Sequence, residues 1–95
     1  MEEKILTLHP EGKNGVNISR EKYNHVKYLL LELIEDAGKI TFQELTRIGR
    51  GVLEKESFEG SPMWYITTVK LDLEARGLIE RIPKTSPHEL RLSDK

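Results

Sequence analysis

The stretch "SPMWYITTVKLDLEARGLIER", residues 61–81, contains a start signal and a stop signal for one helix. Ser61 is suited to be the N-cap, and Pro62 fits the first helical position because the amide it lacks would have had no partner. Gly77 is the stop signal, since glycine readily adopts the left-handed conformation that ends a helix. The residues after Gly77 alternate between apolar and polar, as in a strand. The stretch therefore predicts a helix that is followed at once by an extended segment.

This predicted helix has two apolar sides. At about 100° per residue, Ile66, Val69 and Leu73 form one stripe, which we assign to the core. A second set lies about 100–200° away from Ile66. Burying a side chain such as tryptophan or leucine contributes about 1.5–3 kcal/mol, so this second side is expected to be covered. Its members are Trp64, Thr68, Leu71 and Ala75, and Thr67 borders them.

The chain before residue 61 predicts an extended arm and two more helices. Residues 1–18 are extended in character and allow a turn or a loose hairpin near Asn14-Gly15. Ser19 is the expected N-cap of a helix over about residues 20–37, where apolar residues recur at three- and four-residue steps. We expect residues 1–18 to form an N-terminal arm packed on a domain of residues 19–95.

A second helix is predicted after the short apolar piece at Ile40. Thr41 and Glu44 have the spacing of a capping box, and the apolar stripe continues to about residue 55. Gly49 and Gly51 lower the stability of this helix by about 1 kcal/mol each relative to alanine. They are read either as an early helix end or as the site of a close helix crossing.

The C-terminal region predicts a hairpin. "LIERI" (78–82) and "HELRL" (88–92) alternate in polarity, and the proline-containing "PKTSP" between them forms a rigid tip. The order of elements is extended segment, helix, short strand, helix, turn, helix and hairpin. This order predicts an α+β fold of the winged helix-turn-helix type.

One local match supports this fold. "LDLEARGLIER" (71–81) resembles the end of the recognition helix and the first wing strand of MarR-like regulators, in which a leucine, a glutamate, a glycine and a similar "LIER" follow in this order. The resemblance covers about residues 20–92. It implies a winged helix-turn-helix with three helices, a C-terminal two-stranded wing and an extended N-terminal arm. The whole chain also resembles a family of short, uncharacterised winged-helix proteins, which implies no particular activity.

The MarR-like pattern implies a face for DNA. Carried over by position, it places Trp64, Thr67, Thr68 and Leu71 at the base-facing positions. That face lacks the Arg, Lys, Asn and Gln side chains that read base edges best. Phosphate contacts need only a few cations, so a formal net charge of −1 does not exclude DNA binding. Candidates for further contacts are Arg47, Arg50, Lys70, Arg81, Lys84, Thr85, Ser86 and Arg91.

Two observations weaken the interpretation that these cations form a positive patch for DNA. Each candidate cation, taken alone, is also compatible with an ordinary solvated surface position. Four acidic residues lie beside the candidates on the third helix and the wing: Asp72, Glu74, Glu80 and Glu89.

The sequence is compatible with three explanations of what covers the second apolar side. It is buried by the arm, it forms an interface with a second copy or a partner, or it is a tolerated part of a DNA-facing helix. An exposed apolar patch with an aromatic anchor is typical of interfaces. The arm residues available to cover it are Ile5, Leu6, Leu8, Val16 and Ile18.

Composition and motifs exclude several other classes. The 95 residues have no cysteine, so disulfides and thiolate sites are excluded, and the three histidines lack metal-ligand spacing. No apolar run is long enough to span a bilayer, and the acidic N-terminus does not resemble a secretory signal. We expect a cytoplasmic protein that is not an enzyme and has no cofactor, no metal and no small-molecule ligand.

The leading hypothesis from the sequence is a DNA-binding transcriptional regulator that forms a homodimer, since such readers usually pair half-sites. The alternative is a protein-interaction or assembly module that does not bind DNA. The alternative would use the outer face of the third helix: Trp64, Thr68, Leu71 and Ala75.

Overall fold

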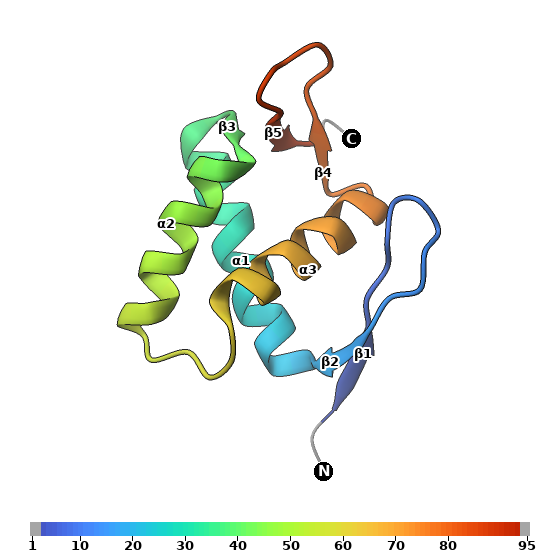
Figure 1. Ribbon diagram of the computed structural model, residues 1–95, viewed down its shortest axis with the longest axis vertical. Helices are drawn as coiled ribbons and strands as arrows, with labels where there is room; N and C mark the ends of the chain where they lie inside the picture. Colours follow the sequence, from blue (N-terminus) through green and yellow to red (C-terminus); the bar gives the residue numbers. More distant parts are fainter. Residues whose placement is uncertain (1–2, 94–95) are drawn as a thin grey trace.

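The computed structural model describes residues 3–93, and its fold is α+β (Figure 1). The helices are α1 (Arg20–Ala37), α2 (Phe42–Lys55) and α3 (Pro62–Ala75). The strands are β1 (Lys4–Leu6), β2 (Asn17–Ser19), β3 (Ile40–Thr41), β4 (Ile79–Arg81) and β5 (Glu89–Leu92). They form two antiparallel sheets, β1–β2 and β3–β5–β4. Within the described part of the chain, no helix is both long and apolar enough to cross a membrane.

The helix ends lie where the sequence predicts them. The hydroxyls of Ser19, Thr41 and Ser61 each accept a hydrogen bond from the amide three residues later, at 3.3, 3.1 and 3.3 Å. After α1, Gly38 has a φ of 78°, and after α3, Gly77 has a φ of 76°. Short-range capping chemistry therefore determines where each helix begins and where α1 and α3 end.

The three helices pack around one core, and α3 contributes its first apolar stripe to it. Ile66, Val69 and Leu73 are all fully buried, which confirms their assignment to the core. The sheet closes the core with the buried side chains of Ile79 and Leu90. Figure 1 shows α3 lying in front of α1, with α2 on one side and the N-terminal hairpin on the other.

Gly49 allows α2 to cross close to α3. A Cβ atom at this position would lie 3.2 Å from Cδ1 of Ile66. The helix runs on without interruption to Lys55, so the early end considered for the two glycines is wrong. The predicted close crossing occurs at Gly49 and not at Gly51, where a Cβ would meet open space.

The C-terminal sheet has three strands, where the sequence predicted a two-stranded wing. β5 pairs with β4 on one side and with β3 on the other, so that Leu90 lies opposite both Ile40 and Arg81. Ile40 and Leu90 are both buried, and this shared burial brings the short strand against the hairpin. The hydroxyl of Thr85 donates to the Ile82 carbonyl at 2.8 Å and accepts from the Glu89 amide at 3.0 Å, which braces the loop.

The described part of the arm is a hairpin. Beyond the β1–β2 pairing, the Thr7 amide donates to the Val16 carbonyl at 2.9 Å, and the Val16 amide donates to the Thr7 hydroxyl at 3.0 Å. A Cβ at Gly15 would lie 1.7 Å from the Thr7 carbonyl oxygen, so only glycine fits this approach. The hairpin lies beside α3 and the first turns of α1 (Figure 1). Residues 1–2 of the predicted arm lie outside the described residues.

Candidate functional site: the outer face of α3

The outer face of α3 is open at its N-terminal half. Met63 and Trp64 are 48% and 45% exposed, and Thr67 is also exposed. The residues further along this face are only partly accessible: Thr68, Leu71 and Ala75. The predicted second apolar side is therefore divided into an exposed first half and a half-covered second half.

The arm covers part of this face. A hollow of about 140 Å³ lies between them, with Leu8 and Val16 of the arm on one wall and Trp64, Thr68 and Leu71 of α3 on the other. Leu8 and Val16 are themselves 43% and 39% exposed. Of the three explanations compatible with the sequence, burial by the arm therefore holds for part of this face. Trp64 stays accessible.

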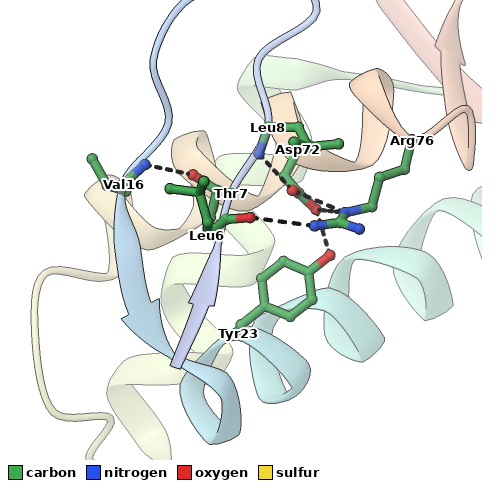
Figure 2. Close-up of polar contacts among 7 residues, drawn as sticks. All are labelled: Leu6, Thr7, Leu8, Val16, Tyr23, Asp72 and Arg76. Carbon is green, nitrogen blue, oxygen red and sulfur yellow. Dashed lines mark hydrogen bonds and ion pairs between the residues drawn. The ribbon is translucent and has the colours of Figure 1, made fainter. Parts of the chain in front are cut away.

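Asp72 joins the arm to α3 and α1 (Figure 2). Its carboxylate is fully buried and accepts hydrogen bonds from the Leu8 amide at 2.8 Å and from the Tyr23 hydroxyl. Arg76 donates through Nε to both carboxylate oxygens, at 3.0 and 2.8 Å, and through Nη2 to the Leu6 carbonyl at 3.4 Å. We call this cluster the Asp72 latch. From the sequence, Asp72 was expected only to reduce the positive charge near the candidate cations. Its i,i+4 spacing to Arg76 was nevertheless a signal that the two residues pair.

Because of the Asp72 latch, the free energy of unfolding is expected to fall at alkaline pH. Burial, and then the hydrogen bond to Asp72, raise the pKa of Tyr23 to about 12 from an ordinary value near 10. Because the folded state holds this proton more tightly, its contribution is fully present below about pH 10 and is lost between about pH 10 and 12. That loss is expected to be on the order of 2 kcal/mol.

The measurement is urea unfolding, followed by circular dichroism, from about pH 8 to about pH 12. Tyr23→Phe serves as the comparison because lysines and the other tyrosines titrate equally in both proteins. The advantage of the wild type over Tyr23→Phe is expected to shrink as the pH rises. An advantage that stays constant over this range would contradict the role of the Tyr23 proton.

Lys70 is not available for a phosphate contact. It is 6% exposed, its Nζ lies 2.7 Å from the Glu74 carboxylate, and it also lies 4.9 Å from the centre of the Phe42 ring. Glu74 also accepts from Arg81 Nε at 3.1 Å. The expectation that Lys70 is a surface cation is wrong. Its angle on the helix places it at the core boundary, and the start of α2 covers that boundary.

The other candidate arginines are exposed but paired with carboxylates. Arg47 donates to Glu44, Arg50 lies 3.9 Å from Glu54, and Arg91 lies 2.6 Å from Glu80. Such surface pairs contribute only about 0–1 kcal/mol, so each arginine can exchange its carboxylate for another anion at low cost.

The candidates fall into two groups by position. Arg50 Nη1 lies 3.7 Å from the Met63 sulfur, which places Arg50 beside the open half of α3. Lys84, Thr85 and Ser86 lie in the loop between β4 and β5, where Lys84 has a φ of 65° and makes no ion pair within residues 3–93. In this part of the chain, no three His, Asp or Glu side chains gather as metal ligands.

The fold defines a small α+β protein with three helices and two antiparallel sheets. Residues 4–90 match the family described as "Family of unknown function (DUF6958)", and the chain belongs to this family. Comparison with curated proteins and with solved structures found no match.

Proposed function

We propose that the chain is a winged helix-turn-helix protein that binds duplex DNA as a regulator. The order of helices, with a hairpin after the third, supports the fold assignment. α3 corresponds to the recognition helix, and the β4–β5 hairpin corresponds to the wing. This part of the proposal rests on the resemblance to MarR-like regulators, and fold alone does not define a function.

The observation that carries the DNA proposal is the position of Arg50 against the start of α3. Its guanidinium contacts Met63, next to the exposed Trp64 and Thr67. A duplex that met this half of α3 would place a phosphate within reach of Arg50 and of Arg47, one turn earlier. The hairpin-loop cation Lys84 would contact a second stretch of backbone.

DNA binding is therefore expected to be weak and strongly dependent on salt. Neutralising three phosphates gives a slope of about −3 for log K against log salt concentration. The measurement is fluorescence anisotropy of a labelled mixed-sequence duplex between about 50 and about 200 mM salt. Arg50→Glu is expected to weaken binding at least about tenfold, because it replaces an attraction by a repulsion.

Lys27→Glu is the matched control. It makes the same charge change on α1, where the lysine lies over the rings of Tyr23 and Tyr28. If micromolar protein fails to bind at low salt, or if both reversals weaken binding equally, the proposed DNA surface is wrong.

A protein partner on the outer face of α3 is the second candidate. It is favoured by the exposed apolar side chains around the hollow, since patches with a tryptophan anchor are typical of interfaces. Under this candidate, Trp64→Ala abolishes self-association or partner binding and Arg50→Glu does not. The exposed apolar residues that line the hollow are Leu8, Val16 and Trp64.

A further inference from the structure

A groove separate from α3 lies between the C-terminal half of α1 and the sheet. It has a volume of about 630 Å³, and its apolar wall comes from Tyr28 and Leu31 of α1 with Leu78 and Leu92. Tyr28 is 62% exposed and Leu78 is 39% exposed. A second hollow of about 530 Å³ adjoins it, because Leu92 and Ser93 line both.

The polar rim of the groove is acidic. Glu32 and Glu35 line it, and Asp36 follows on the same helix. Within residues 3–93 these three carboxylates make no ion pair, whereas most of the other carboxylates there are paired with a cation. Arg91 and Glu35 both line the adjoining hollow, where Arg91 lies 2.6 Å from Glu80, but no cation among the described residues lines the groove itself. The groove therefore presents uncompensated negative charge beside an exposed apolar wall.

The helix dipole makes this charge unfavourable for α1 itself. Glu35 and Asp36 lie in the last turn, at the negative end of the helix, and that turn contains no basic residue. A cation supplied from outside would remove both the mutual repulsion of the carboxylates and their conflict with the dipole. The chemistry of the rim therefore specifies a positively charged occupant.

We propose that this groove binds a short segment of a partner protein that combines apolar side chains with lysine or arginine. The apolar side chains pack on Tyr28, Leu31 and Leu92, and the cations pair with Glu32 and Glu35. From Tyr28 to Glu35 the helix rises about 10 Å, which corresponds to two turns of a docked helix or to three or four extended residues.

Other occupants fit the groove less well. The phosphates of nucleic acids and of anionic lipids would be repelled by the same carboxylates. A second copy of this chain has a formal net charge of −1, so it supplies no excess of cations for the acidic rim. The proposal does not depend on DNA binding, since no α3 residue lines the groove.

Selection from a displayed library of random dodecapeptides on the immobilised protein tests the proposal. The enriched peptides are expected to carry net positive charge and at least one large apolar residue. A synthetic peptide of the dominant sequence is then titrated by fluorescence anisotropy. Glu35→Lys and Tyr28→Ala are each expected to weaken its binding at least about tenfold, and added salt is expected to weaken it further.

Glu59→Lys is the matched control, because it makes the same charge change on another exposed carboxylate, in the loop between α2 and α3. Binding that is lost in Glu35→Lys but retained in Glu59→Lys supports the groove. The proposal is overturned if no peptide is enriched, or if the enriched peptides are acidic or bind Glu35→Lys unchanged. It is also overturned if sedimentation shows a dimer that Tyr28→Ala dissociates, since a second copy would then occupy the groove.

Discussion

Replacing Asp72 by alanine is expected to lower the free energy of unfolding by about 3–4 kcal/mol. The change removes a fully buried carboxylate and leaves the Tyr23 hydroxyl and the Leu8 amide without their acceptor. Arg76 also loses its partner, but its side chain is 33% exposed and can turn towards water. For a domain of this size, the midpoint of thermal unfolding would fall by about 15–25 °C.

Urea unfolding measures this loss of stability, and Trp64 emission reports whether the arm separates from α3. Because the latch holds the arm against α3, we expect the emission of the folded Asp72→Ala protein to shift to longer wavelength as the arm loosens. Asp36→Ala is the matched control, since this carboxylate is exposed, and its effect should stay within about 0.5 kcal/mol. A loss below about 1 kcal/mol in Asp72→Ala would mean that the latch is not a main stabilising contact.

Replacing Glu74 by glutamine is expected to cost about 3 kcal/mol. The Glu74 side chain is 9% exposed and that of Lys70 is 8% exposed, so the substitution leaves a buried ammonium without a counter-charge. Breaking a buried pair on one side is costly because the remaining charge stays out of water. The loss of the contact to Arg81 adds little, since that side chain is 49% exposed.

Glu80→Gln provides the comparison, because it breaks an ion pair whose side chains are 40% and 48% exposed. This control should lose no more than about 1 kcal/mol. The double variant Lys70→Met/Glu74→Met removes both charges and should recover most of the stability that Glu74→Gln loses. If Glu74→Gln and Glu80→Gln cost the same, burial does not decide the strength of the Lys70–Glu74 pair.

The elements of the fold were predictable from local signals. The N-caps at Ser19, Thr41 and Ser61 are read from residues within one turn, and each is confirmed by its hydrogen bond. The core stripe of α3 follows from helical periodicity alone, and its three residues are buried. The short strand at Ile40 was expected, but its pairing with β5 was not, because the two strands are far apart in the sequence and no local pattern shows which strands pair.

The environment of the outer face of α3 was only partly predictable. Its angles placed Trp64 and Leu71 away from the core, and the arm lies there as one of the expected coverings. The angle of Lys70, about 40° from the core stripe, did not reveal that the Phe42 ring covers it. Nor did the sequence show that Asp72 is buried, since its partners Tyr23 and Leu8 are 49 and 64 residues away along the chain.

The sequence by itself therefore determined the helices, their ends, the hairpin and the two apolar sides of α3, because caps and periodicity depend on residues within one or two turns. Only the tertiary structure decided which charges are usable. The elements packed around a charged side chain decide whether it is exposed to solvent, buried in a contact such as the Asp72 latch, or unpaired at the rim of a groove. That packing brings distant parts of the chain into contact, so neither helical angles nor spacing alone could specify it.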